Sequence, residues 1–277
     1  MAGRDSAVGL IAGAGTFPEI LGGAIKAAGR VLVCVQVAGS SGVLPTIADV
    51  YRRLPIGAEA LEALRASAVR EVLVSGRFPR TGLLTAGDAF RHALLEGTPD
   101  RRDMALFERF AALLATLGME LIDQPRFVGD LLAQPGVISA RAPAREEEDD
   151  MALGRMVARQ LADLDVGQTV VLRQGIILAV EAAEGTDATI RRGGAMAPGA
   201  VIVKVSRNHQ DPRFDIPAVG PDTIAAMREV GASALCVDAR RTLLLHRARL
   251  IQDADEAGIA VVAADAPPLG TPVHGDT

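Results

Sequence analysis

Short apolar runs, each followed by a helical pattern, constrain the fold of this 277-residue chain more than any other feature. In the first half, we expect strands at residues 8–12, 31–37, 71–75 and 118–122, and helices at residues 17–28, 58–68, 86–95 and 103–117. Thr16 and Glu19 have the spacing of a capping box at the start of the first helix. Continuous apolar strands that alternate with helices are typical of a parallel sheet covered on both faces. The sequence therefore predicts an α/β fold whose N-terminal nucleotide-binding domain, residues 1–133, has a Rossmann-like parallel sheet.

The pattern changes after residue 133. Residues 134–149 contain a Pro-Gly pair and most of the acidic run 146–150, and they are predicted to link two domains. The alternative, which we favour for the acids themselves, is that they open a helix as a solvated run, because acids suit the positive end of a helix dipole. Further helices are expected at 150–164, 221–230 and 247–257, and strands at 169–172, 176–180, 200–205, 234–237, 242–245 and 259–263. These elements predict a C-terminal mixed α/β catalytic domain over residues 150–266, followed by a flexible tail over residues 267–277.

The composition excludes several classes of protein. Acidic residues outnumber basic ones by 34 to 29, and the only aromatic residues are seven phenylalanines and one tyrosine, which argues against a nucleic-acid binder. Cys34 and Cys236 lie far apart in apolar runs, so we expect two buried thiols in a reducing compartment. No apolar run reaches the ~20 residues of a membrane-spanning helix. We therefore expect a cytoplasmic protein.

A glycine loop follows the first predicted strand. Gly13, Ala14 and Gly15 stand directly before a helix, where backbone N–H groups and the helix dipole can hold an anion. The third glycine of a dinucleotide fingerprint is replaced by Pro18, and the second strand ends on Gln36 without an acid for a ribose. The loop therefore disfavours NAD(P) and leaves a nucleotide or diphosphate open, with a plain glycine turn as the alternative.

Three acids follow the predicted strand at 176–180. Glu181, Glu184 and Asp187 lie within seven residues, and carboxylate oxygens are ligands that suit Mg²⁺. Alternatively, Thr186 or Asp187 only caps the helix that follows. On the residues alone, the cap is the favoured interpretation.

The polar segment 204–217 is the richest candidate for chemistry. Arg213 and Asp215 are two residues apart, so an extended backbone would place both side chains on one face. An arginine beside a carboxylate suits a metal-assisted phosphoryl site, in which one group holds phosphate oxygens and the other a cation or water. The alternative is a surface loop of weakly paired charges.

Several of these motifs together resemble a known family, the LpxI-type UDP-2,3-diacylglucosamine pyrophosphatases of lipid A biosynthesis. The matching stretches are residues 9–15 with Pro18, residues 175–187 (GIILAVEAAEGTD) with 190–192, residues 203–205 with 210–217, Gly220 with Thr223, and residues 239–243. The chain departs from the family where Gly13-Ala14-Gly15, Ser75-Gly76-Arg77 and Arg207-Asn208 stand. The resemblance covers nearly the whole chain.

The resemblance implies Mg²⁺-dependent hydrolysis of UDP-2,3-diacylglucosamine to UMP and 2,3-diacylglucosamine 1-phosphate (lipid X). It also implies two lobes that close over the substrate. The family's essential acid falls on Asp215, and the acids of its EGTD motif fall on Glu184 and Asp187 as further metal ligands. We expect Lys204 and Arg213 to hold the diphosphate oxygens. The substrate contacts that we expect are Gly13, Ala14, Gly15, Thr16, Ser75, Gly76, Thr186 and Gln210.

The same resemblance implies work on an acylated UDP-sugar at the cytoplasmic face of the inner membrane, with membrane contact through the lipid substrate. No nucleic-acid partner is expected, and a homodimer stays open.

Two rival functions remain at this point. One is another phosphoryl-transfer enzyme on a nucleotide sugar, and the other is a non-catalytic nucleotide-sugar binding protein.

Overall fold

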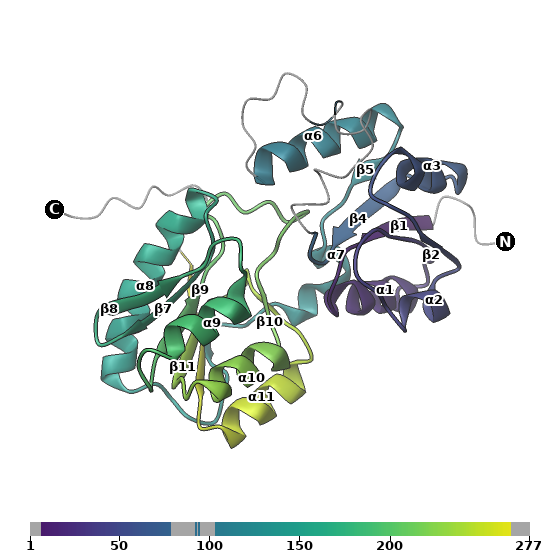
Figure 1. Cartoon of the computed structure of the whole chain (residues 1–277). Helices are drawn as coiled ribbons and strands as arrows, with labels where there is room; N and C mark the ends of the chain where they lie inside the picture. The colour runs from purple at the N-terminus through teal and green to yellow at the C-terminus, as the bar shows by residue number, and fades with distance from the viewer. Residues whose placement is uncertain (1–6, 79–91, 93, 95–102, 267–277) are drawn as a thin grey trace. The chain divides into compact units, whose positions relative to one another are not determined.

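The computed structural model describes residues 7–78, 92, 94 and 103–266, which form two compact units. Unit 1 comprises the chain up to Gly129 together with Pro212–Asp215, and unit 2 comprises Asp130–Asp211 and the chain from Ile216 onward (Figure 1). Each unit has its own sheet and its own core clusters. The predicted fold class, two α/β lobes, is confirmed.

Unit 1 is built on a parallel five-stranded sheet. Its strands are β1 (Ala7–Ala12), β2 (Val31–Gln36), β3 (Val50–Arg53), β4 (Glu71–Ser75) and β5 (Glu120–Leu121), in the order β3-β2-β1-β4-β5. The central strand β1 is buried because β2 and β4 flank it, with Leu10 opposite both Cys34 and Leu73. The sequence did not indicate β3, because this edge strand is made of Val-Tyr-Arg-Arg and is only partly buried.

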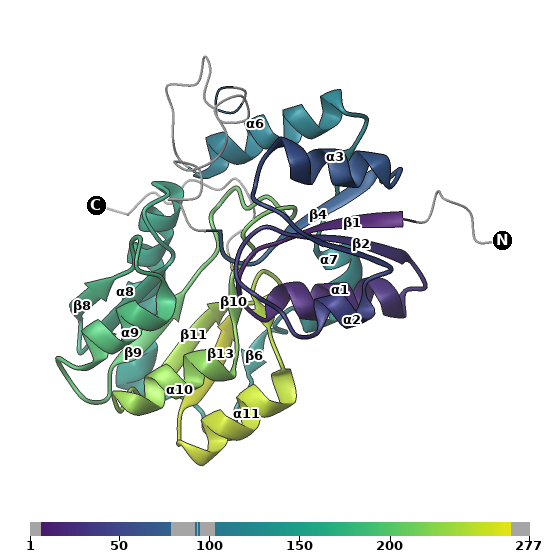
Figure 2. The ribbon, with the colours of Figure 1, turned by 45° about the vertical axis from the view of Figure 1, so that its right-hand side comes forward.

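Helices cover both faces of this sheet. In Figure 2, α1 (Phe17–Ala27) and α2 (Leu44–Ile47) lie on one face, while α3 (Ala58–Ala66) and α6 (Asp103–Thr116) lie on the other. The short helix α7 (Pro125–Val128) packs against α1. The predicted capping box of α1 is wrong, because Thr16 makes no side-chain cap and Glu19 instead accepts a hydrogen bond from Ser41 Oγ at 2.6 Å. Most of the helix predicted at 86–95 lies outside the described residues.

Unit 2 contains a mixed six-stranded sheet. Its strands are β6 (Gly136–Val137), β7 (Thr169–Arg173), β8 (Ile176–Val180), β9 (Val201–Lys204), β11 (Ala234–Asp238) and β13 (Ala260–Ala264), in the order β6-β13-β11-β9-β7-β8. Strands β9, β11 and β13 are parallel, and β7 is antiparallel to β8 and β9. The carboxyl ends of β8, β9, β11 and β13 therefore meet at one edge. Strands β10 (Ala218–Val219) and β12 (Leu243–Leu244) form a separate parallel pair.

The sheet of unit 2 separates two apolar layers. Helix α8 (Arg145–Asp163) packs on β7 and β9, and α9 (Thr186–Gly194), α10 (Pro221–Glu229) and α11 (Arg247–Glu256) cover the opposite face (Figure 2). Successive strand residues alternate between these layers. Val170 and Leu172 pack in the layer beneath α8, whereas Val171 packs in the layer beneath α9 and α10.

The acidic run has a structural role in unit 2. It lies inside α8, which begins at Arg145, so the predicted linker 134–149 is part of this unit and contains β6. Glu147 is buried, binds Arg141 Nη1 at 2.9 Å and accepts a hydrogen bond from Ala144 N at 2.8 Å. Asp150 is buried too, and accepts hydrogen bonds from the backbone N–H groups of the β7–β8 turn. The run opens a helix as expected, but these two acids are not solvated.

Both cysteines are buried free thiols, as predicted. Burial raises the pKa of Cys34 to about 12 and that of Cys236 to about 11, so neither is a ready nucleophile. Among the helices that the structure describes, none combines the length and the apolar character of a membrane span. The predicted tail 267–277 lies outside the described residues.

Candidate functional site

The glycine loop of unit 1 is packed against the segment that follows β4. Gly13 N donates to Ser75 O at 2.7 Å and Ala14 N donates to Arg77 O at 2.9 Å. A Cβ atom at Gly13 would lie 2.6 Å from Arg77 O, so this close backbone approach requires glycine. The N–H groups of Gly13 and Ala14 are thus used within the protein, and the expectation that they hold an anion is wrong.

Backbone N–H groups that are not already bonded to a described residue begin at Gly15, at the start of α1. The backbone N–H groups of Gly15, Thr16 and Phe17 make no hydrogen bond to another described residue, and they lie at the start of an eleven-residue helix. Ser75 lies on β4, opposite Ala12 of the neighbouring strand β1. It is only 3% exposed, and its Oγ has no hydrogen-bond partner among the described residues. Of the predicted contacts in this unit, Gly15, Thr16 and Ser75 therefore have donors to offer a ligand.

Unit 2 presents a buried lysine at the carboxyl edge of its sheet. Lys204 ends β9 and is 5% exposed. Its Nζ donates to Thr186 Oγ1 at 2.6 Å, and Thr186 Oγ1 donates to Glu181 Oε1 at 3.0 Å. Glu181 follows β8 and Thr186 begins α9, so three elements converge on one ammonium group. The arrangement gives a fixed positive charge, as a site for phosphate oxygens requires.

The carboxylate of Glu181 is held in its charged form. Burial alone would raise its pKa, but the Lys204 ammonium, the hydroxyls of Thr169 and Thr186, and the N–H of Gln168 outweigh this effect. The net result is a pKa below the ordinary value of 4.5. The negative charge of the buried Glu181 therefore offsets the positive charge of Lys204. The sequence did not indicate this role, because it showed Glu181 only as one of three nearby acids.

Of the two acids of the EGTD motif, Glu184 is already paired within the protein. Glu184 forms an ion pair with Arg192 and accepts a hydrogen bond from Thr189 Oγ1 at 3.3 Å. The N-cap of α9 is Gly185 without a side-chain cap, so the helix-capping alternative for Thr186 and Asp187 is also wrong. Asp187 lies in the first turn of α9, where the helix dipole favours an acid.

The three predicted metal ligands are divided between the units. Asp215 belongs to unit 1, whereas Glu184 and Asp187 belong to unit 2. Within the described parts of the chain, no group of three His, Cys, Asp or Glu side chains is placed to hold a metal ion. The carboxylate of Glu184 is also occupied by Arg192. A metal ion at Glu184 would therefore compete with Arg192 for the carboxylate.

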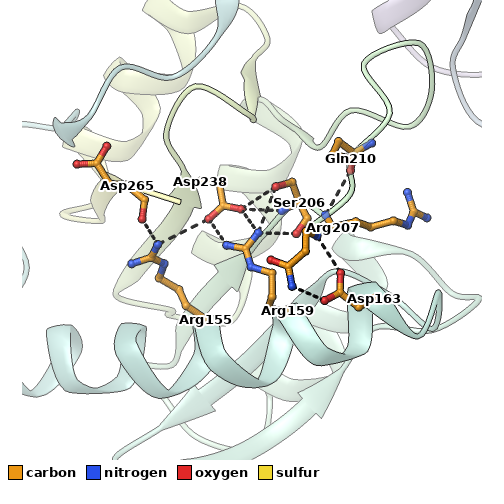
Figure 3. Close-up of polar contacts among 9 residues, drawn as sticks. Arg155, Arg159, Asp163, Ser206, Arg207, Gln210, Asp238 and Asp265 are labelled. Atoms are coloured by element: carbon orange, nitrogen blue, oxygen red, sulfur yellow. Dashed lines mark hydrogen bonds and ion pairs between the residues drawn. The ribbon is translucent and has the colours of Figure 1, made fainter. Parts of the chain in front are cut away.

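A buried ion pair fixes the start of the polar loop after β9. Asp238, which is 0% exposed at the end of β11, binds both terminal nitrogens of Arg159 at 2.8 Å (Figure 3). Ser206 N donates to Asp238 Oδ2 at 2.8 Å, and Arg159 Nη1 donates to Ser206 O at 2.6 Å. Arg155 lies beside the pair, 3.9 Å from Asp238. One carboxylate thus ties α8, β11 and the loop together.

The next loop residues are bound to the end of α8. Asp163 accepts hydrogen bonds from Asn208 N at 2.8 Å and from Asn208 Nδ2 at 2.5 Å (Figure 3). Arg207 pairs with Asp165 at 2.6 Å, and its backbone N–H donates to Gln210 Oε1 at 3.3 Å. Arg207 and Asn208, one of the places at which the chain departs from the family pattern, therefore fasten the loop to its own unit.

The segment Pro212–Asp215 belongs to unit 1 by its contacts. Gln124 N donates to Pro212 O at 3.1 Å, and the ring of Phe214 stacks on Phe107 with centroids 4.3 Å apart. The chain turns at residues 212–213, and Asp215 has a φ of 48° in the left-handed region. The predicted extended backbone from Arg213 to Asp215 is therefore wrong, although both residues do belong to one unit.

Sequence reasoning missed Arg159, Asp238 and Gln124. Asp238 stands directly after a buried strand, and that position could have indicated a buried carboxylate. Arg159 lies on the apolar face of α8, between Ala158 and Ala162, and its partner is 79 residues away. No local pattern identifies such a partner.

Comparison with known proteins gives two family matches and one curated relative. Residues 7–131 match the LpxI N-terminal domain, and residues 134–262 match the LpxI C-terminal domain. A protein of Caulobacter vibrioides named UDP-2,3-diacylglucosamine pyrophosphatase LpxI is 30% identical over 275 residues, covering 93% of this chain and 97% of that protein.

Removal of the Asp238 carboxylate tests the buried ion pair. Asp238→Ala leaves the Arg159 guanidinium buried without its counter-charge, so we expect the free energy of unfolding to fall by about 3–5 kcal/mol. Urea denaturation measures the change. Glu229→Gln, which breaks an exposed ion pair with Arg191, is the control and should leave the unfolding midpoint unchanged. Equal midpoints for Asp238→Ala and wild type would contradict this account.

The lowered pKa of Glu181 predicts a contribution to acid unfolding. The carboxylate stabilises the fold above its unfolded value of 4.5, and this stability is lost as the pH falls through the lower folded value. Glu181→Gln should therefore be less stable at neutral pH and should lose stability less steeply below pH 4.5 than wild type. Denaturant unfolding at a series of pH values measures both slopes. Parallel slopes would show that Glu181 does not carry this dependence.

Proposed function

The chain belongs to the LpxI family, and from this membership we propose that it hydrolyses the diphosphate of UDP-2,3-diacylglucosamine to UMP and 2,3-diacylglucosamine 1-phosphate. Two observations support the proposal. The N- and C-terminal family domains together span residues 7–131 and 134–262, and the curated relative is named for this substrate and reaction class. The reaction would place the chain in lipid A biosynthesis.

The proposed roles follow from the charge of the substrate. A diphosphate repels a nucleophile, so the protein must neutralise its oxygens and orient water. In unit 2, we assign the phosphate oxygens to Lys204, whose ammonium is fixed by Thr186. In unit 1, we assign the orientation of water to Asp215 and further diphosphate oxygens to Arg213. We assign the nucleotide phosphate to the N–H groups of Gly15 and Thr16. Gly76 and Gln210 remain further predicted contacts.

Mg²⁺ dependence is a separate part of the proposal, supported by the substrate rather than by a ligand set. A hard divalent cation binds phosphate and carboxylate oxygens and would offset the charge of the diphosphate. Asp215, Asp187 and Glu184 remain the proposed ligands, and Glu184 would have to leave Arg192 to serve. Activity that is lost in EDTA and restored by Mg²⁺ would support the dependence, whereas full activity in EDTA would remove it.

The acyl chains of the substrate support a peripheral location at the cytoplasmic face of the inner membrane. A substrate with two acyl chains resides in a bilayer, so the enzyme must reach the membrane surface. Vesicle flotation with and without the substrate tests this part of the proposal. The homodimer stays a prediction that sedimentation velocity would test.

The key experiment compares wild type with Asp215→Asn in an assay for UMP release. Asparagine tolerates the left-handed backbone at this position, so the change removes the charge and leaves the loop conformation intact. We expect wild type to release UMP and the variant to lose at least about a hundredfold in kcat, the range for removal of a positioned base. Asp222→Asn, an exposed acid in the first turn of α10, is the matched control and should keep full activity.

The other outcomes separate the rival functions. Equal release by both proteins would keep the reaction and remove Asp215 from its role. UMP that forms only when an acceptor alcohol is added would identify a transferase. Tight substrate binding without release by wild type would identify a nucleotide-sugar binding protein.

A further inference from the structure

One buried glutamine joins the Pro212–Asp215 segment to the sheet of unit 1. Gln124 is 2% exposed and stands at the N-cap of α7. Its Nε2 donates to Val74 O at 2.7 Å, next to the carboxyl end of β4, and to Arg213 O at 3.4 Å. Its backbone N–H donates to Pro212 O at 3.1 Å. A single residue therefore connects the carbonyl groups of Pro212 and Arg213 to strand β4.

An aromatic stack holds the same segment from a helix. Phe107 of α6 is buried, and its ring lies 4.3 Å from that of Phe214 with an interplanar angle of 19°. Phe214 also packs against the apolar core of unit 1, and the Arg213 guanidinium lies 5.8 Å from the Phe107 centroid. Stacked rings and a cation over a ring each add specific geometry to apolar burial. These contacts fix the residues immediately before Asp215.

Asp215 itself has a backbone conformation that needs such support. Its φ of 48° lies in the left-handed region, which is unfavourable for residues other than glycine and persists where the surroundings impose it. Gln124 and Phe107 contact the three residues that precede Asp215, and these contacts help to impose the backbone path. The backbone that leads to the carboxylate is thus contacted by two residues of the N-terminal half of the chain.

We propose that Gln124 and Phe107 are positioning residues that hold the Asp215 carboxylate in its working orientation. This inference rests on the proposed function, in which Asp215 orients water. Both residues act through the loop backbone and the Phe214 ring and take no part in bond breaking. A displacement of about 1 Å at a reacting group can lower a rate by about a hundredfold. The contacts of Gln124 and Phe107 with the loop are thus expected to affect kcat.

Two variants remove the anchors separately. Gln124→Met keeps the side-chain length and removes the amide donor, and Phe214→Leu keeps an apolar side chain and removes the stack. We expect each variant to lose about 10–100-fold in kcat with KM within about twofold of wild type. Phe214→Tyr retains the ring and should restore activity. If the buried Gln124→Met variant does not fold, the partly buried Phe214→Leu carries the test.

Matched controls change the same chemistry elsewhere in unit 1. Tyr51→Phe removes a partly buried hydrogen bond to Gln36, which measures 2.7 Å. Phe110→Leu removes a ring that packs against the same core as Phe107. Both controls should keep wild-type kcat. A fall in kcat that is equal in the controls and in the anchor variants would identify a general loss of stability and overturn the inference.

Hydrogen exchange supplies a readout that needs no substrate. Exchange of the peptide that contains residues 210–217 should accelerate in Gln124→Met and in Phe214→Leu, but not in Phe110→Leu. Unchanged exchange, or faster exchange with wild-type kcat, would overturn the positioning role. Absence of UMP release by wild type would instead overturn the proposed function and this inference with it. The two failures are therefore distinguishable.

Discussion

The buried ion pair between Arg159 and Asp238 is the interaction on which the polar loop depends. The carboxylate of Asp238 ends β11, receives Arg159 from α8 and accepts the backbone N–H of Ser206, so it sets the point at which the chain leaves β9 (Figure 3). A buried charge without its partner is costly, so the ion pair resists separation of α8, β11 and the loop. Asp163 and Asp165 then extend the fixed path as far as Asn208.

The two halves of this loop are held by different units. Residues 206–211 belong to unit 2, and Pro212–Asp215 belong to unit 1, where Gln124 and Phe107 receive them. The proposed catalytic acid therefore lies in the C-terminal half of the sequence, in a segment that residues of the N-terminal half contact. This division gives unit 1 a second task besides the proposed binding of the nucleotide at α1. The ammonium group of Lys204 is held by a separate network within unit 2.

Local patterns predicted the strands that are continuous apolar runs, whether buried, as in β4, or partly exposed, as in β8. The bounds of β4 and β8 match the sequence prediction, because continuous apolar runs identify such strands. The pattern failed where a partner distant in sequence decides the structure. Glycine is required at position 13 because the backbone of Arg77 lies so close to it. Asp215 has a left-handed backbone in a segment that Gln124 binds, and Gln124 lies 89 residues before Arg213. The sequence could indicate that Asp215 is polar and placed after a strand, but not what holds it.

The central claim is that water attacks the diphosphate, and a single-turnover reaction in H₂¹⁸O tests it most directly. Hydrolysis predicts a single ¹⁸O atom in the phosphate of either UMP or 2,3-diacylglucosamine 1-phosphate, as measured by mass spectrometry. The labelled product would also identify the phosphorus atom that water attacks. Formation of UMP without ¹⁸O in either product would contradict the account, because the transferred group would then have gone to an acceptor other than water.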